Sequence, residues 1–432
     1  MPKLPSSSFE LAQHTLANGL RVVLAPDHSA PVVGVSVLYD VGIRSEPEGR
    51  TGFAHLFEHL MFQGSANLEK LEHFRYVQSS GGTFNGSTHF DYTNYFEALP
   101  ANALERGLFL EADRMLSPRL TEENLANQLD VVKNEIRVNV LNRPYGGFPW
   151  IQLPAVLFDT FANSHNGYGG FEDLESATVE DAADFFKKYY APANAVLAVG
   201  GDLDVDTTMA LIEKHFGGIK KRAAPKRPSF AEPALTAERR ATHDDPHAPS
   251  PAVAIGYRLA DPVSSFDALL AKVLLGEILS DGDSSRLQRR LVQRDHLVTD
   301  IAAYVGEFGD PFDERDPTTF TISAHYPEAA SLDAVLGAVD DELRRIAEDG
   351  LQDGELDRVR TRLVSVLLRE LDAVMSRTLA IAKFALIHSN AALVNELPAR
   401  LAAITEADVR AAAADLAPER RAVLEVIAGG AA

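Results

Sequence analysis

The order of predicted strands and helices occurs twice along this chain. In the first half, an apolar run at residues 32–39 predicts a strand, several helices follow, and the half closes with a helix at 178–190 and a strand at 195–200. The second half opens with a similar apolar run at 251–257 and closes with a helix and the strand 421–427. Two strand-bounded units of roughly 170 to 180 residues indicate an internal duplication, with a chance likeness of two α+β domains as the alternative.

The segment between the halves has the composition of a linker. Residues 221–250 are rich in proline, alanine and charge, and such segments often connect domains. The sequence therefore predicts a first domain at 1–220 and a second at 251–432. Because strands and helices do not follow a regular βαβ order, we expect an α+β fold of two duplicated α/β sandwich domains. Apolar residues at helical spacing predict further helices at 54–63, 103–115, 122–138, 265–279, 284–293, 332–349 and 353–371.

The composition narrows the classes of function. The 432 residues carry a formal net charge of -21, which argues against nucleic-acid backbones and anionic membrane surfaces as partners. The sequence contains no cysteine, so structural disulfides, thiol catalysis and cysteine-ligated zinc are excluded. A transition metal in this protein would need histidine and carboxylate ligands.

Targeting signals are not evident in the sequence. No apolar run has the length that a bilayer-spanning helix needs. The first ten residues lack the apolar core of a signal peptide. We therefore expect a cytoplasmic protein, and a periplasmic protein whose signal peptide has been removed is the alternative.

A five-residue motif in the first half has the spacing of a metal site. His55 and His59 are four residues apart, so a helix places both imidazoles on one face, one turn apart. Two histidines in this arrangement can bind one tetrahedral zinc ion. Glu58 lies beside that face and fits a general base, and the order His-x-x-Glu-His is the inverted form of the commoner zinc-peptidase motif. A helix with two surface histidines and a glutamate is the alternative, because so short a pattern also arises by chance.

A catalytic zinc site needs a third protein ligand and keeps the fourth position for water. Glu135 is the best candidate because it lies in the amphipathic helix predicted at 122–138. Glu122, Glu123 and Asp130 lie in the same helix. Composition alone does not choose between these four carboxylates.

The sequence around the motif resembles a known family of zinc peptidases. Residues 52–64 look like the active-site helix of the pitrilysin or insulinase family, peptidase family M16. The length of the chain is closest to the subfamily of mitochondrial processing peptidase and its bacterial relatives. Residues 131–135 match the segment that carries the third ligand of the family. The resemblance therefore implies Zn2+ bound by His55, His59 and Glu135.

The resemblance also implies how a peptide substrate binds. Residues 81–88 are similar to the edge strand with which substrates of the family pair, which makes Asn85, Gly86 and Ser87 the expected substrate-binding residues. A peptide that adds to a sheet edge is held by main-chain hydrogen bonds, so we expect broad specificity for unfolded peptides. Glu58 would take a proton from the zinc-activated water and deliver it to the leaving amine.

Two departures from the family pattern concern the site. Gln128 stands where the family often has a glutamate, seven residues before the ligand, and it can hydrogen-bond near the metal without adding charge. Many active members also carry an arginine and a tyrosine seven residues apart in their later domain, both directed at the substrate carbonyl. The three tyrosines of the second half here have no arginine seven residues before them: Tyr257, Tyr304 and Tyr326.

The missing pair leads to a hypothesis about partners. We expect this chain to be the zinc-bearing subunit of a heterodimer, in which a related M16 subunit supplies the arginine and the tyrosine. A homodimer or monomer that uses other donors is the alternative. A second class of function is a non-catalytic core or assembly subunit. Such relatives usually lose a histidine or a glutamate of the motif, whereas all of these residues are present here.

Overall fold

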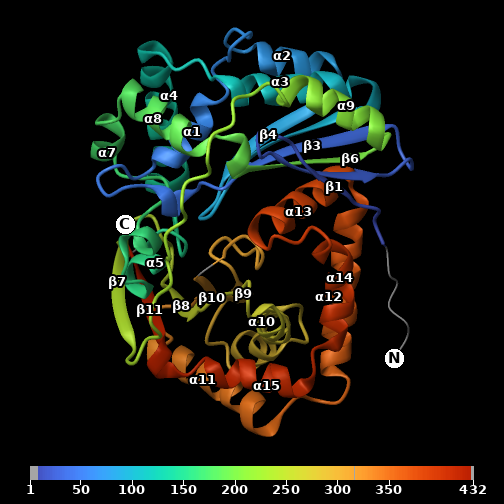
Figure 1. Ribbon diagram of the computed structural model, residues 1–432. Helices are drawn as coiled ribbons and strands as arrows, with labels where there is room; N and C mark the ends of the chain where they lie inside the picture. The colour runs from blue at the N-terminus through green and yellow to red at the C-terminus, as the bar shows by residue number, and fades with distance from the viewer. Residues whose placement is uncertain (1–7, 316, 430–432) are drawn as a thin grey trace.

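The computed structural model of this protein describes residues 8–315 and 317–429, which form two domains, each built on one mixed sheet with helices packed against it (Figure 1). This arrangement confirms the expected α+β fold of two sandwich domains. The strands of the first sheet are β1 (Ala12–Thr15), β2 (Arg21–Pro26), β3 (Val32–Tyr39), β4 (Thr83–Thr88), β5 (Thr93–Pro100) and β6 (Ala195–Gly201). Those of the second are β7 (Arg239–Asp245), β8 (Ala252–Leu259), β9 (Asp300–Val305), β10 (Thr318–His325) and β11 (Arg421–Ala428).

The two sheets share one topology, which supports the internal duplication. The strand order is β1-β2-β6-β3-β5-β4 in the first sheet and β7-β11-β8-β10-β9 in the second. Apart from β1, every strand of the first sheet has a counterpart in the second sheet. The counterparts follow one another in the same order along the chain and occupy the same positions in their sheets. The directions also agree: β2 is parallel to β6 and β7 is parallel to β11, whereas the other neighbours are antiparallel.

Strand β7 corrects the predicted linker. It lies within residues 221–250 but belongs to the second sheet, where it pairs with β11 as β2 pairs with β6. The strand has polar residues, and its side chains alternate between exposed and partly buried positions. Such a strand is held at the sheet edge mainly by main-chain pairing, which leaves no apolar run in the sequence. The segment predicted as a linker therefore supplies a strand to the second domain.

Most of the predicted helices lie close to their expected positions. The helix predicted at 332–349 has these bounds in the structure, and the one predicted at 284–293 is helical only from residue 286. The helices of the first domain are α1 (Phe53–Leu60), α2 (Glu72–Ser79), α3 (Leu104–Leu116), α4 (Glu122–Ile136), α5 (Gln152–Leu157), α6 (Phe161–Ser164), α7 (Phe171–Glu175), α8 (Val179–Tyr189) and α9 (Val205–Phe216). Those of the second are α10 (Phe266–Ser280), α11 (Leu332–Asp349), α12 (Glu355–Asp372), α13 (Val374–Ile387), α14 (Leu393–Ala403) and α15 (Glu406–Asp415).

Helix α13, which the sequence patterns do not predict, joins the two halves. Figure 1 shows α2, α3 and α9 on one side of the first sheet and α13, from the second half, on the other. There α13 packs across β3 and β6. Glycines in these strands allow the close approach, because a Cβ at Gly34 would lie 2.9 Å and one at Gly200 would lie 2.5 Å from the Thr378 hydroxyl. Both faces of the first sheet are therefore covered near its centre, while β4 lies at its edge.

A buried ion pair of the first domain takes part in a contact with the second domain. Arg44 donates to Asp91 at 2.8 Å, and both side chains are almost inaccessible to solvent. Asp91 also accepts the main-chain N–H of Arg315 at 2.7 Å, and Arg315 donates from its side chain to Asp40 at 2.8 Å. Buried charges must be paired to be tolerated, so these contacts fix the second domain against the first.

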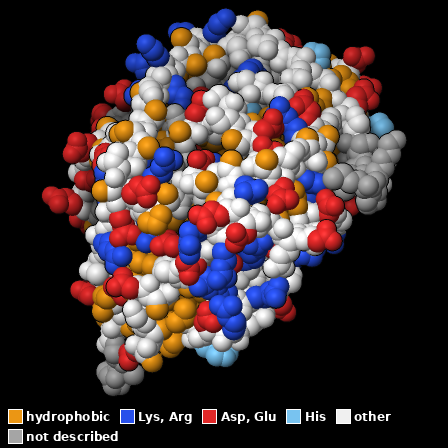
Figure 2. Space-filling view, turned by 90° about the horizontal axis from the view of Figure 1, so that it is seen from below, with side chains coloured by type: hydrophobic (Ala, Val, Ile, Leu, Met, Phe, Trp, Pro, Cys, Tyr) orange, Lys and Arg blue, Asp and Glu red, His pale blue; other side chains and the backbone are white. Residues whose placement is uncertain are grey.

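The face of the second domain farthest from the first sheet has a mixed charge. Figure 2 shows basic and acidic side chains interspersed over this face, which carries α11 and α15. On α11, Arg344 and Arg345 pair with Asp341 and Glu342, at 2.6 Å and 3.0 Å. None of the helices in the described part of the chain has the length and apolar content that crossing a bilayer requires.

Candidate metal centre

The metal motif lies on α1, whose start is fixed by a buried carboxylate. Gly52 precedes the helix with φ of 78°, a left-handed conformation that favours glycine. The Glu46 carboxylate accepts the N–H groups of Gly52 at 2.9 Å and Ala54 at 2.7 Å. A negative charge at a helix N-terminus satisfies free N–H groups and interacts favourably with the helix dipole. Glu46 thus determines where α1 begins and how its histidines are placed.

Three side chains with metal-ligating atoms meet beside α1. The Nε2 atoms of His55 and His59 are 3.3 Å apart. Glu135, on α4, lies 3.7 Å from His55 Nε2 through Oε1 and 3.5 Å from His59 Nε2 through Oε2. Bonds of about 2.0–2.1 Å in tetrahedral geometry separate two zinc ligands by roughly 3.3 Å. The three donors therefore fit one zinc ion, with a fourth position left for water.

The ionisation of two of these groups, His55 and Glu135, suits a cation. Burial lowers the pKa of His55 to about 4, with the neighbouring His59 acting in the same direction, so His55 is neutral and has a free electron pair. Burial also acts to lower the pKa of His59, but the carboxylates of Glu135 and Glu58 outweigh it and raise the pKa. The hydrogen bond from His59 holds the pKa of Glu135 below its usual value, which keeps this ligand ionised.

Of the four candidate carboxylates on α4, only Glu135 reaches the histidines. Glu122, Glu123 and Asp130 are exposed on other parts of the helix. Gln128 lies two turns before Glu135, is buried, and contributes a hydrogen bond that raises the pKa of His59. The structure thus places Gln128 next to a ligand histidine, where it can orient the ring without adding charge.

Glu58 lies between the metal motif and the edge strand β4. Its Oε2 accepts a hydrogen bond from the Thr88 hydroxyl at 2.6 Å. Its Oε1 faces the main chain of β4, since a Cβ at Gly86 would lie 3.1 Å from that atom. Burial raises the pKa of Glu58, which makes the carboxylate a better proton acceptor. Glu58 is therefore placed to act on a molecule that lies between the metal site and β4.

The three expected substrate-binding residues lie on two different faces of β4. Gly86 faces Glu58. Asn85 is exposed, and its side-chain oxygen accepts the N–H of Gly86 at 3.0 Å. Ser87 points away from the metal site, where its hydroxyl contacts Asn94 and His89. Strand β4 pairs with β5 on one side, and no described strand pairs with its other edge. That edge is open for another strand.

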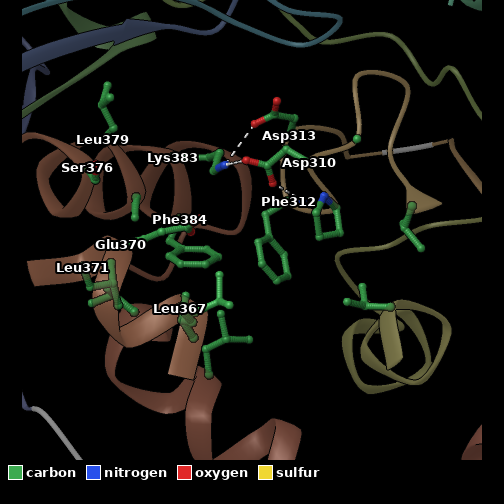
Figure 3. A pocket seen from close by; sticks show the side chains of 18 of the residues that line it. Asp310, Phe312, Asp313, Leu367, Glu370, Leu371, Ser376, Leu379, Lys383 and Phe384 are labelled. Atoms are coloured by element: carbon green, nitrogen blue, oxygen red, sulfur yellow. Dashed lines mark hydrogen bonds and ion pairs between the residues drawn. The ribbon is translucent and has the colours of Figure 1, made fainter. Parts of the chain in front are cut away.

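A cavity of about 640 Å³ lies on the opposite face of β4 and β5, between the two domains. Ser87 and Asn94 line it from the first sheet. Figure 3 shows Lys383 reaching from α13 to Asp310 and Asp313 at its polar end. The labelled apolar side chains that line the cavity are Phe312, Leu367, Leu371, Leu379 and Phe384.

A second group of possible metal ligands is occupied by an arginine. His73, Glu97 and Glu111 are fully buried between α2, α3 and β5. The Arg114 guanidinium pairs with Glu111 and lies 3.8 Å from Glu97. Because Arg114 already supplies a cation to these carboxylates, the first group is the better candidate for a metal site.

Two residues of the site have no motif that identifies them in the sequence, and both come from the loop 165–170. His165 Nε2 lies 2.9 Å from Glu46, the carboxylate that caps α1. The Tyr168 hydroxyl donates to Glu135 at 3.2 Å, and its ring packs edge-on against His55 with a centroid distance of 5.2 Å. The only local signal for this loop is its glycine content, with three glycines in residues 167–170.

Known proteins that are similar to this chain include zinc proteases. Residues 21–144 match the family described as Insulinase (Peptidase family M16), and residues 176–363 match the domain described as Peptidase M16 inactive domain. The zinc protease PqqE of Helicobacter pylori is 30% identical over 358 residues, which cover 80% of this chain and 77% of the relative. A relative from Arabidopsis thaliana, named for the beta subunit of mitochondrial-processing peptidase, is 25% identical over 409 residues, covering 94% of this chain and 76% of the relative.

Solved structures have the same fold. The crystal structure of a protease from Helicobacter pylori matches with a TM-score of 0.88 and 25% identity, covering 97% of this chain and 100% of that one. A peptidase M16 inactive domain from Pseudomonas fluorescens matches with a TM-score of 0.83 at 16% identity, over 98% of each chain. The match to the Insulinase family contains the histidine motif and Glu135, and the match to the inactive domain begins after them. The chain therefore belongs to peptidase family M16, with its metal motif in the first of two related domains.

Proposed function

We propose that this protein is a zinc-dependent endopeptidase that cleaves peptides or unfolded segments. The observation that carries the proposal is the meeting of His55, His59 and Glu135 beside a carboxylate, Glu58, that faces an open sheet edge. The relatives named zinc proteases support the same chemistry. Zinc, bound by these three residues, would polarise a peptide carbonyl and lower the pKa of a water molecule.

The residues of the chain have separate roles in this reaction. Glu58 accepts a proton from the attacking water and then delivers it to the leaving nitrogen. The water oxygen bonds to the carbonyl carbon and the C–N bond breaks, which yields a new carboxyl group and a new amine. Thr88 orients Glu58 through its hydrogen bond, so that the carboxylate stays directed at the reacting atoms.

The substrate is proposed to bind as an added strand along the open edge of β4. Main-chain hydrogen bonds hold such a strand with little dependence on sequence. Successive side chains of a strand point to opposite faces. Every second substrate side chain would then point to the side of α1, and the others to the side of the cavity lined by Ser87 and Asn94.

A related M16 subunit is proposed as a partner. None of the three tyrosines of the second half is directed at the metal site: Tyr257 is buried in the core, Tyr326 donates to Glu425, and Tyr304 lines the interdomain cavity. A relative named as a subunit supports an assembly of this kind. Hydrolysis by the purified chain alone, at the rate found in the presence of a related subunit, would contradict the need for a partner.

The proposed function is tested by replacing Glu58. Glu58→Gln should lower peptide turnover by about 10²–10⁴-fold, because the amide cannot accept the proton. The metal content should stay at one zinc per chain, measured by elemental analysis, because the ligands are unchanged. Glu123→Gln, the same change at an exposed position of α4, serves as the control. Full turnover in the Glu58 variant would exclude this mechanism.

Metal removal separates the enzyme from a non-catalytic subunit. An enzyme of the proposed type loses turnover when zinc is chelated and regains it when zinc is restored. A core or assembly subunit would bind its partner equally well with and without the metal. A chain that binds no zinc at neutral pH would contradict the proposed function.

A further inference from the structure

Tyr168 brings a hydrogen-bond donor into the metal centre from the first domain. Its hydroxyl lies 3.2 Å from Glu135 Oε1, so it is next to the place where the three metal-ligating atoms meet. A neutral tyrosine hydroxyl both donates and accepts hydrogen bonds. The side chain of Asn139 hydrogen-bonds the same hydroxyl, which leaves its single proton directed toward the ligands.

Close contacts of the main chain fix the position of Tyr168. Gly169 has φ of 76°, and a Cβ there would lie 2.2 Å from the carbonyl oxygen of Thr51. A Cβ at Gly52 would likewise lie 2.3 Å from the carbonyl oxygen of Tyr168. The loop can approach the start of α1 this closely only because residues 52 and 169 are both glycines. The contact sets Tyr168 beside His55, in the first turn of α1.

The Tyr168 side chain also packs against two other rings. The His55 ring packs against Tyr168 at 5.2 Å between centroids, and the Trp150 ring lies 5.5 Å away. Tyr168 remains partly exposed. A fixed, partly exposed donor beside a metal site is suited to stabilise charge that develops during a reaction.

We propose that Tyr168 is a catalytic residue that exchanges its hydrogen bond to Glu135 for one to the oxygen of the scissile carbonyl as this oxygen becomes negatively charged. The inference rests on the proposed peptidase function. Tyr168 transfers no proton: the proton of the attacking water passes through Glu58 to the leaving nitrogen, and the hydroxyl proton stays on Tyr168. Because the donor belongs to the first domain, this role does not depend on a residue from a second subunit.

The alternative is a purely structural role, in which Tyr168 only orients Glu135. The two roles predict different responses to the removal of one oxygen atom. A residue that holds a metal ligand affects zinc affinity, by about 10–100-fold when it is lost. A donor to the developing oxyanion affects kcat, by about 10²–10³-fold, and leaves ligand geometry unchanged.

The experiment compares Tyr168→Phe with the wild-type chain, in whichever assembly hydrolyses peptide. Three quantities are measured: zinc affinity by competition with a chelator, kcat and KM with a fluorogenic peptide, and binding of a phosphinate analogue of that peptide to the zinc-loaded protein. We expect kcat to fall about 10²–10³-fold with KM and zinc affinity changed less than about threefold. The phosphinate, which mimics the tetrahedral state, should bind more weakly by a factor similar to the loss in kcat/KM. Tyr145→Phe, which removes a hydroxyl that donates to Ser250, is the control.

Two outcomes would overturn the proposal. One is a kcat equal to that of the wild type. The other is a loss of zinc affinity with turnover restored at saturating zinc, which would assign Tyr168 to the support of Glu135. Both leave the proposed peptidase function intact, whereas a wild-type chain that cleaves no peptide in any assembly contradicts that function first.

Discussion

At the scale of single residues, the Glu46–His165 pair supports the metal centre from outside it. Glu46 caps α1 and is itself buried. Burial raises the pKa of Glu46, which means that its charged form carries a desolvation cost. His165, which lies 2.9 Å from it, supplies a positive charge that offsets this cost when the imidazole is protonated. The capping of the helix that carries both histidine ligands therefore depends on a titratable neighbour.

The pair predicts a pH-dependent stability. Burial acts to lower the pKa of His165, but Glu46 and the carbonyl of Phe161 outweigh it and raise the pKa above its usual value of about 6.5. A raised pKa in the folded state stabilises the protein fully below about pH 6.5, and this contribution is lost as the pH rises through the folded pKa. His165→Gln should therefore lower the urea midpoint of unfolding more at pH 6 than at pH 9. The same change at the exposed His14 is the control, and an equal loss at both pH values would contradict the prediction.

At the scale of elements, the metal centre requires α1, α4 and the loop 165–170 to meet. Helix α1 carries two donors, α4 carries the third, and the loop contacts both the start of α1 and Glu135. Thr51 reinforces this contact, because its hydroxyl accepts the N–H of Gly170 at 3.0 Å. The loop 165–170 is thus held in place against both the start of α1 and Glu135.

Alanine substitutions at two adjacent glycines test whether the loop 165–170 supports the site. Gly169→Ala places a methyl group against the Thr51 carbonyl at a left-handed main-chain position. We expect it to lower the free energy of unfolding by more than about 1 kcal/mol and to weaken zinc binding, since the loop must move. Gly170→Ala is the matched control, because its Cβ meets no atom within 4 Å and should change stability by less than about 0.5 kcal/mol. Urea unfolding and zinc titration measure both effects, and equal behaviour of the two variants would refute the prediction.

At the scale of the whole molecule, the first sheet is completed by the second half. Helix α13 covers β3 and β6, and the charges around Asp91 connect the domains. Burial acts to raise the pKa of Asp91, but three surrounding guanidinium groups outweigh it and hold the pKa below its usual value. The two domains therefore share one interface that depends on packing and on paired charge.

Removal of the Asp91 charge tests this interface. Asp91→Asn leaves the buried guanidinium of Arg44 without its charged partner, and breaking a buried pair in this way costs about 3–5 kcal/mol. The free energy of unfolding in urea should fall by this amount. Glu69→Gln is the control, because Glu69 pairs with Arg119 at an exposed site and such pairs contribute less than about 1 kcal/mol. Similar losses in the two variants would contradict the role given to Asp91.

Much of the fold follows from local patterns in the sequence. Apolar runs locate β3, β6, β8 and β11, and helical spacing locates α11 and α12 within two residues at either end. The polar strand β7 and the helix α13 have no comparable local pattern. Strand β7 is held by main-chain pairing with a distant strand, and α13 has apolar residues around most of its surface because it is buried between the domains.

One part of the site follows from local geometry in the sequence alone. The spacing of His55 and His59 places both rings on one helix face, whatever the rest of the fold. Helical spacing left four carboxylates of α4 as candidates, and the family resemblance pointed to Glu135. The packing of α4 against α1 places Glu135 at these rings, and tertiary contacts alone bring Tyr168 to Glu135 and His165 to Glu46, across 33 and 119 residues. Periodicity records which neighbours share a face, whereas contacts between distant segments depend on how whole elements pack, and no local pattern encodes that packing.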